Sequence, residues 1–81
     1  MRLKGKVSIV TGAAGGIGRG IAYRLAAEGS AVTVADIDVE GAEETVRTIT
    51  SEGGMAMALE TDVTGRSMVD HMVAKTAETF G

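Results

Sequence analysis

Four glycines follow a short β-branched run near the start of the chain. Residues 7–18 read VSIVTGAAGGIG, with glycines at positions 12, 15, 16 and 18. An apolar helical pattern begins directly after them, so the order is strand, glycine turn and helix. The N-terminus of a helix offers unpaired backbone N–H groups and a partial positive charge, which together favour a phosphate. The segment therefore predicts a cradle for the pyrophosphate of a dinucleotide.

Three of these glycines have separate roles in such a cradle. Gly12 allows the sharp turn out of the strand, and Gly16 carries no side chain that would block a pyrophosphate. Gly18 lets the helix lie close to the sheet. The alternative is a glycine-rich turn that binds nothing. We favour the cradle because the turn joins a buried strand to a helix and because an acid follows at position 36.

Asp36 ends the second apolar run, about twenty residues after the glycine turn. A carboxylate at this place can accept hydrogen bonds from both hydroxyl groups of an adenosine ribose, and it repels a 2′-phosphate. No arginine or lysine follows at positions 37 or 38 to reverse that preference. Asp36 therefore predicts NAD rather than NADP. The alternative is that Asp36 is a turn residue or a helix cap, and Asp38 could fill the second of these roles.

Asp62 and Val63 follow the third strand at the same edge of the predicted sheet. An aspartate there can accept a hydrogen bond from the exocyclic amine of adenine, and a neighbouring backbone N–H can meet a ring nitrogen. The competing interpretation is that Asp62 helps to cap the last helix beside Thr64. The residues alone leave both interpretations open.

Short apolar runs predict the strands that position these residues. Residues 6–11 and 31–36 are rich in β-branched residues and read as buried parallel strands. Residues 55–60 are a weaker third strand, because methionine and alanine are poor strand formers. The alternation of strands and helices supports this third assignment.

Helical spacing of apolar residues predicts three helices, each after one strand. Asp38 and Thr64 are the expected N-terminal caps of the second and third helices, and glycines 29, 53 and 54 are expected at C-terminal caps. The helices are expected over residues 16–28, 39–52 and 66–80. Their expected apolar faces include Ile17, Ile21 and Leu25, with Ala22 and Ala26 beside them, in the first helix, and Val69, Met72, Val73, Thr76 and Phe80 in the last.

Three strand–helix units with short connections define an α/β fold. Right-handed crossovers give a parallel sheet of spatial order 3-2-1, with the first two helices on one face and the third on the other. The expected architecture is a three-layer Rossmann-type βαβαβα fragment of an incomplete doubly wound sheet. Without a fourth strand, the first strand is an open edge through which the chain is expected to self-associate.

Composition excludes several classes of function. The 81 residues fit one small domain, and the net charge of −3 is too mild to indicate nucleic acid or an anionic membrane as a partner. Cysteine is absent, which excludes disulfides and thiolate metal sites, and His71 is the one histidine, so no metal site is expected. The N-terminal apolar run is too short for a signal peptide or a membrane span. We expect a cytoplasmic protein.

The motifs together resemble the short-chain dehydrogenase/reductase family. Residues 11–18 match its TGxxxGxG pattern, and Asp36 and the Asp62–Val63 pair fall where the family contacts ribose and adenine. All 81 residues look like the N-terminal third of the family. The resemblance implies hydride transfer between NAD(H) and an alcohol or carbonyl group, and a homo-oligomeric parent enzyme. It implies a cofactor site of Gly12, Gly15, Gly16, Ile17, Gly18, Asp36, Ile37, Asp62 and Val63.

The catalytic residues of that family have no counterpart here. The family uses a tyrosine with a lysine four residues later, a serine and an asparagine. The one tyrosine is Tyr23, in the first predicted helix, and Ala27 stands four residues later. We expect Tyr23 to be a helix-surface or packing residue and the chain to be a partial NAD(P)-binding domain, residues 1–81, that stops before the fourth strand. By itself it is expected to have no dehydrogenase activity.

Two other functions fit parts of the sequence. A methyltransferase is suggested by the GxGxG pattern of residues 16–20 and by an acid ending the second strand, but its glycines would directly follow the first strand. Here Gly16 lies five residues beyond Thr11. A nucleotide-binding module without catalysis also fits. A P-loop is excluded because no lysine followed by serine or threonine closes the turn.

Overall fold

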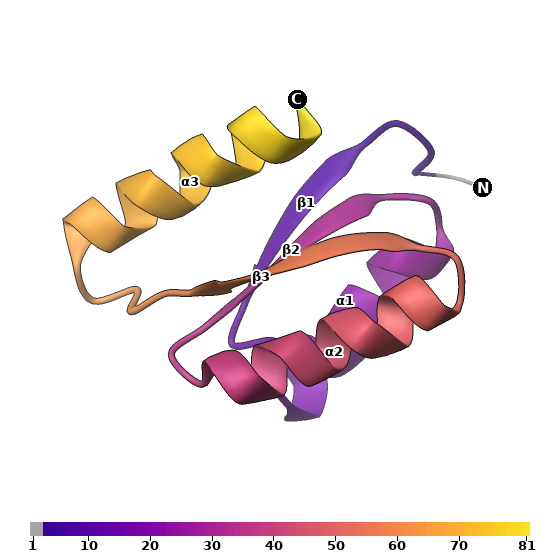
Figure 1. The fold of residues 1–81 in the computed structure, drawn as a ribbon, viewed down its shortest axis with the longest axis horizontal. Helices are drawn as coiled ribbons and strands as arrows, with labels where there is room; N and C mark the ends of the chain where they lie inside the picture. Colours follow the sequence, from indigo (N-terminus) through magenta and orange to yellow (C-terminus); the bar gives the residue numbers. More distant parts are fainter. Residues whose placement is uncertain (1–2) are drawn as a thin grey trace.

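A computed structural model describes residues 3–81 as three consecutive strand–helix units (Figure 1). Each predicted element is present, and the predicted boundaries agree with the observed ones to within one residue. Among the helices of the described residues, none is both long and apolar enough to cross a membrane. The elements are β1 (Val7–Thr11), α1 (Gly16–Ala27), β2 (Ala31–Asp36), α2 (Val39–Ser51), β3 (Met55–Glu60) and α3 (Arg66–Phe80).

The three strands form one parallel sheet with β2 in the centre, which confirms the predicted order 3-2-1. Val7 of β1 lies opposite Ala31 of β2, which in turn lies opposite Met55 of β3. Helices α1 and α2 cover one face and α3 covers the other, so the predicted three layers are present (Figure 1). Residues 31–35 of β2 are all buried, because helices lie on both faces of the central strand.

Strand β1 lies at an edge of the sheet. Within residues 3–81 it pairs with β2 alone, so its second edge is open. The expectation that this edge mediates self-association stays a prediction.

The packing of α1 differs from the predicted one. Ala22 is fully buried against the sheet, whereas Ile17 and Ile21 are 85% and 47% exposed. The spacing of four residues is as predicted, but the row that meets the sheet contains Gly18 and Ala22 in place of the two isoleucines. Small residues occupy the contact because α1 begins directly over the end of β1, where no larger side chain fits.

Helix α3 packs against the other face through Met72 and Thr76, both buried. The hydroxyl groups of Thr33 and Thr76 lie 2.8 Å apart and form a buried hydrogen bond between β2 and α3. Val73, which was expected on the apolar face, is half exposed. The buried row of α3 is therefore narrower than its apolar pattern indicates.

Most of the predicted helix ends are confirmed. Asp38 caps α2 by accepting a hydrogen bond from the Gly41 N–H at 3.1 Å, and Gly29 and Gly53 have the positive φ of C-terminal caps. Two predictions were wrong. Gly54 has no positive φ, and its lack of a side chain makes room for Ile49. The N-cap of α3 is Gly65, because the hydroxyl group of Thr64 bonds to Asp62 instead of the helix.

Candidate functional site

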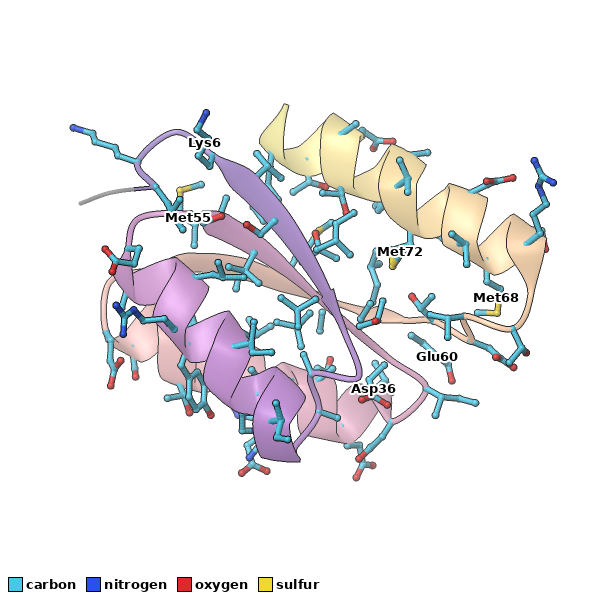
Figure 2. All side chains as sticks on the ribbon, turned by 180° about the vertical axis from the view of Figure 1, so that it is seen from behind. Lys6, Asp36, Met55, Glu60, Met68 and Met72 are labelled. Carbon is cyan, nitrogen blue, oxygen red and sulfur yellow. The ribbon has the colours of Figure 1, made fainter. Side chains whose placement is uncertain are left out.

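The candidate site lies at the carboxyl ends of the strands, where the three strand–helix connections meet. Figure 2 shows Asp36 and Glu60, the last residues of β2 and β3, near this edge, and Lys6 and Met55 near the opposite one. An open cavity of about 180 Å³ lies here. Its lining includes five of the nine predicted cofactor-binding residues: Gly12, Asp36, Ile37, Asp62 and Val63. The other four, Gly15, Gly16, Ile17 and Gly18, continue the turn from Gly12 into α1.

The glycine turn has the backbone that the sequence predicts. Gly12 and Gly16 have φ values of +67° and +58°, a left-handed conformation that side chains disfavour. A Cβ atom at Gly18 would lie 2.8 Å from the carbonyl carbon of Gly12, which confirms the close approach of α1 to the end of β1. A Cβ atom at Gly16 would meet nothing within 4 Å, so this side of the turn is open.

The N-terminus of α1 has no protein cap. Its N-cap residue is Gly15, which has no side chain to cap the helix, and no acidic residue lies in the first turn. The first N–H groups of a helix have no partner within the helix, so those of α1 need a partner from outside the helix. This arrangement is suited to an anion.

Asp36 links the end of β2 to the glycine turn. Its Oδ2 accepts a hydrogen bond from the backbone N–H of Ala14 at 3.0 Å, and its Oδ1 accepts one from the N–H of Asp38 at 2.9 Å. Asp36 therefore does form a turn with Asp38, whereas the cap of α2 is Asp38 itself. Each carboxylate oxygen can accept more than one hydrogen bond, so the side chain retains capacity for a ligand.

Asp62 lines the same cavity but makes only local hydrogen bonds. Its Oδ1 accepts from the Thr64 hydroxyl at 2.6 Å and from the Thr64 N–H at 3.0 Å. These bonds, the one from the hydroxyl first, hold the pKa of the Asp62 carboxyl group below its ordinary value. Asp62 thus forms a turn with Thr64 and does not cap α3.

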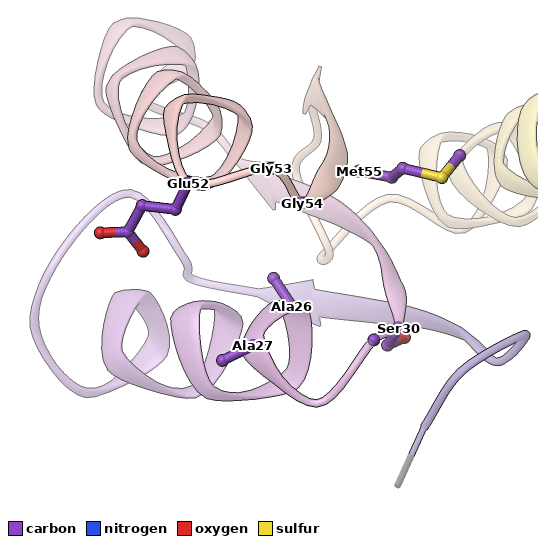
Figure 3. Close-up of a pocket in the computed structure, with 8 residues that line it drawn as sticks. Ala26, Ala27, Ser30, Glu52, Gly53, Gly54 and Met55 are labelled. Carbon is purple, nitrogen blue, oxygen red and sulfur yellow. The ribbon is translucent and has the colours of Figure 1, made fainter. Parts of the chain in front are cut away.

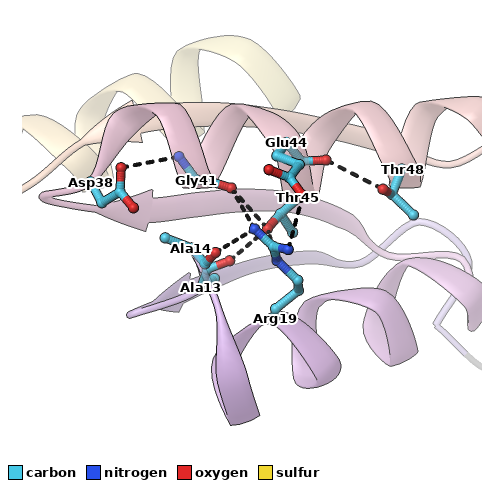
Figure 4. A network of polar contacts seen from close by, with 8 residues as sticks. All are labelled: Ala13, Ala14, Arg19, Asp38, Gly41, Glu44, Thr45 and Thr48. Carbon is cyan, nitrogen blue, oxygen red and sulfur yellow. Dashed lines mark hydrogen bonds and ion pairs between the residues drawn. The ribbon is translucent and has the colours of Figure 1, made fainter.

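Sequence reasoning missed a polar network behind the turn (Figure 4). The guanidinium group of Arg19 donates hydrogen bonds to the carbonyl oxygen of Ala14, to that of Gly41 at 3.1 Å, and to the Thr45 hydroxyl at 2.8 Å. The Thr45 hydroxyl in turn lies 2.8 Å from the carbonyl oxygen of Ala13. One signal could have found it. Gly41 is a glycine inside a helix, which is costly unless something packs against it, and here Ala14 does.

Tyr23 does not line the cavity at the carboxyl ends of the strands. It is partly buried on α1 and packs against the core, which confirms its interpretation as a packing residue. Within residues 3–81, no group of histidine, cysteine, aspartate and glutamate side chains is arranged to hold a metal ion.

A second pocket lies at the amino ends of β2 and β3 (Figure 3). It has a volume of about 280 Å³, and its lining consists mainly of small residues such as Ala26, Ser30 and Gly54. Glu52 is the one ionisable side chain in that lining. This pocket offers no arrangement of groups for chemistry.

The parallel sheet of order 3-2-1, the glycine turn after its edge strand and the acid at the end of the next strand define the first part of a Rossmann-type fold. A family model described as short chain dehydrogenase matches residues 6–81. The chain belongs to this family.

Named relatives agree with this assignment. The chain is 44% identical to galactitol 2-dehydrogenase of Agrobacterium fabrum over 81 residues, which are 100% of the chain and 30% of the relative. It is also 44% identical to 3beta-hydroxysteroid dehydrogenase 1 of Eggerthella lenta, over 98% of the chain and 31% of the relative. The chain thus spans about a third of the length of these proteins.

Solved structures share the fold. The crystal structure of a hydroxysteroid dehydrogenase from Escherichia coli superposes with a TM-score of 0.97 and 36% identity, over 99% of this chain and 34% of that one. A putative D-mannonate oxidoreductase from Haemophilus influenza, solved with bound NAD, gives a TM-score of 0.93 and 28% identity, over 99% of this chain and 29% of that one.

Proposed function

We propose that this chain is the NAD-binding part of a dehydrogenase that transfers hydride between NAD(H) and an alcohol or carbonyl group. The observation that carries the proposal is the 3.0 Å hydrogen bond between the Asp36 carboxylate and the Ala14 N–H of the glycine turn. This bond holds a ribose-binding acid beside an uncapped helix N-terminus. Family membership and the NAD-bound structural relative support the proposal.

The ADP half of the cofactor has matching groups in this chain. The N–H groups at the start of α1 bind the pyrophosphate, and Gly16 leaves the approach open. Asp36 accepts the hydroxyl groups of the adenosine ribose. Ile37 and Val63, whose side chains are 65% and 55% exposed, cover the adenine, while Asp62 accepts from its amine. The nicotinamide, when bound, would supply the hydride-transfer chemistry, while the residues named here hold the ADP half of the cofactor.

The same acid selects NAD over NADP. A 2′-phosphate would meet the Asp36 carboxylate, and two unit charges 4 Å apart repel by about 1 kcal/mol in water and about 4 kcal/mol near a protein surface. Because about 1.4 kcal/mol corresponds to a tenfold change in affinity, we expect the chain to prefer NAD by at least about fivefold.

The chain alone is proposed to lack dehydrogenase activity. Its one tyrosine packs on α1 and so offers no proton donor at the site. Loss of a positioned acid or base typically costs about 10²–10⁴ in rate. NAD-linked turnover by the purified chain would contradict this part of the proposal.

Calorimetric titration of the chain with NAD, NADP and S-adenosylmethionine tests the proposed function. We expect NAD to bind most tightly. Asp36→Asn, which keeps the shape of the side chain and removes its charge, should weaken NAD by about tenfold or more and NADP by less. The matched control is Glu40→Gln, which removes an exposed acid in the first turn of α2 and should change neither affinity.

Preference for S-adenosylmethionine would favour a methyltransferase and overturn the proposal. Equal losses of NAD and NADP affinity in Asp36→Asn would remove the role of Asp36 in cofactor selection.

A further inference from the structure

Ala14, in the middle of the glycine turn, is held on both sides. Its N–H donates to Asp36 at 3.0 Å, and its carbonyl oxygen accepts from the guanidinium group of Arg19. The preceding carbonyl, that of Ala13, accepts from the buried hydroxyl group of Thr45 at 2.8 Å. Two successive peptide groups of the turn are therefore anchored to side chains from α1 and α2.

Because the peptide group is planar, a hydrogen bond that fixes a carbonyl group also fixes the direction of the next N–H group. In a trans peptide, the carbonyl of one residue and the N–H of the next point to opposite sides. The Ala13 carbonyl points to Thr45, and the Ala14 N–H points away from it to Asp36, as the two hydrogen bonds show. By the same rule, the Ala14 carbonyl points to Arg19, so the Gly15 N–H points away from Arg19.

Arg19 is placed to act as an anchor and not as a ligand of the cofactor. Its side chain is only 24% exposed, and its donors are directed to Ala14, Gly41 and Thr45, with Glu44 as an ion-pair partner at 3.4 Å. A guanidinium group offers five donors in a fixed planar fork, which lets one side chain hold several acceptors at set angles. A lysine could not hold the same set of acceptors.

Thr45 and Gly41 complete the anchor on α2. The Thr45 hydroxyl accepts from Arg19 Nε and lies within reach of the Ala13 and Gly41 carbonyl oxygens, at 2.8 and 3.1 Å. A Cβ atom at Gly41 would lie 2.9 Å from the Cβ atom of Ala14. The bare backbone at position 41 thus lets α2 approach the turn closely enough for these bonds.

We propose that Arg19 and Thr45 are positioning residues that orient two N–H groups of the cofactor turn, that of Gly15 toward the pyrophosphate and that of Ala14 toward Asp36. The inference rests on the proposed function, because it assigns these N–H groups to NAD. It adds a determinant of cofactor affinity that lies behind the site.

Arg19→Met tests the proposal, since it keeps an apolar stem and removes the fork. We expect it to weaken NAD and ADP, which share the pyrophosphate, by about tenfold, and to leave adenosine within about twofold. The matched control is Arg24→Met, on the same helix, whose guanidinium is exposed and pairs only with Glu28 among the described residues. It should change none of the three affinities.

Two threonines of α2 offer a second test variant with its own matched control. Thr45→Val removes the hydroxyl group and should weaken NAD, whereas Thr45→Ser restores the hydroxyl and should bind NAD as the unchanged chain does. Thr48→Val removes an exposed hydroxyl that bonds within α2 and is the control. This series serves also if Arg19→Met fails to fold, which its circular dichroism spectrum would show.

Amide hydrogen exchange in the absence of ligand gives a readout independent of binding. Arg19→Met should raise the exchange rate of the Ala14 amide, which is bonded to Asp36, while amides of β2 keep theirs.

The outcomes separate the two proposals. If the unchanged chain binds no NAD, the proposed function fails and the inference falls with it. If it binds NAD and Arg19→Met binds equally well, only the inference fails. Equal weakening of ADP and adenosine would show that Arg19 merely supports the fold, and would overturn its positioning role.

Discussion

The β1–α1 and β2–α2 connections lie side by side at one edge of the sheet, yet their helices begin in opposite ways. Helix α2 is capped by Asp38, which accepts from the Gly41 N–H, and Glu40 adds negative charge to the first turn. Helix α1 begins after Gly15, without a capping side chain and without an acid in its first turn. The N-terminus of α2 is satisfied by its own side-chain cap, whereas that of α1 has no such cap, as the proposed anion site requires.

The backbones of the two connections differ accordingly. The first contains Gly12 and Gly16 with positive φ, whereas no residue of the second has a positive φ. Asp38 can therefore serve as an ordinary cap, while the turn before α1 requires glycines. The glycines of the first connection therefore have two effects. Gly12 and Gly16 adopt a positive φ without strain, and Gly15 leaves the first N–H groups of α1 without a capping side chain.

The largest expected effect comes from placing a side chain in the close contact between α1 and the end of β1. Gly18→Val places a side chain against the carbonyl group of Gly12, and we expect a loss of about 3 kcal/mol or more in the free energy of unfolding. Urea denaturation followed by circular dichroism measures this. Gly20→Ala is the control, because a Cβ atom there meets nothing within 4 Å, and it should stabilise α1 by up to about 1 kcal/mol. Equal effects of the two changes would contradict the close approach.

Giving α1 the same kind of cap as α2 should raise the stability of the chain and lower its affinity for NAD. Gly15 has an extended backbone, and a Cβ atom there meets nothing within 4 Å, so Gly15→Asp fits. We expect a gain of about 0.5–1 kcal/mol in the free energy of unfolding and at least a tenfold loss of NAD affinity. Gly15→Asn supplies a neutral cap and should weaken NAD less. Unchanged NAD affinity in Gly15→Asp would contradict the proposed anion site.

Removing the cap of α2 should have the converse result. Asp38→Ala is expected to lower the free energy of unfolding by about 1 kcal/mol and to leave NAD affinity within about twofold. Thermal unfolding and calorimetry measure the two quantities on the same sample. Asp38→Asn keeps a capping oxygen and should retain most of the stability. A large loss of NAD affinity in Asp38→Ala would mean that the two connections are not functionally separate.

The smallest effect concerns the third connection, β3–α3. Thr64→Val removes the stronger of the two hydrogen bonds to Asp62, so the pKa of that carboxyl group should rise toward its ordinary value, as NMR titration can measure. The stabilisation from the lowered pKa is present above the ordinary aspartate pKa and disappears as the pH falls through the folded-state pKa. Thr64→Val should therefore slightly lower stability near neutral pH and change little in acid. An unchanged pKa would exclude the Thr64 hydroxyl as its cause.

The sequence predicted the elements well because local signals determine them. Each strand is a short apolar run, and glycines such as Gly12 and Gly29 mark turns through a property of their own backbone. The place of Asp36 beside the turn was also predictable, since parallel strands end at one edge of the sheet. The binding roles of these residues stay predictions.

Pairings between distant residues could not be predicted. Arg19 and Thr45 lie 26 positions apart, and no spacing rule connects them before the fold is known. The apolar pattern of α1 likewise favoured Ile17 and Ile21 as core residues, because such a pattern reflects hydrophobicity alone. It does not show that α1 approaches β1 too closely at Gly18 for a side chain to fit between them. Thr64 was assigned to α3 by its position, although Asp62 competes for its hydroxyl group.

An NMR titration of the backbone amides with NAD tests the central comparison most directly. We predict that the amide signals of residues 14–18, at the start of α1, shift together with that of Asp36, and that those of residues 39–42, at the capped start of α2, shift little. Shifts centred on the start of α2, or none at residues 14–18 while NAD is bound, would contradict the account.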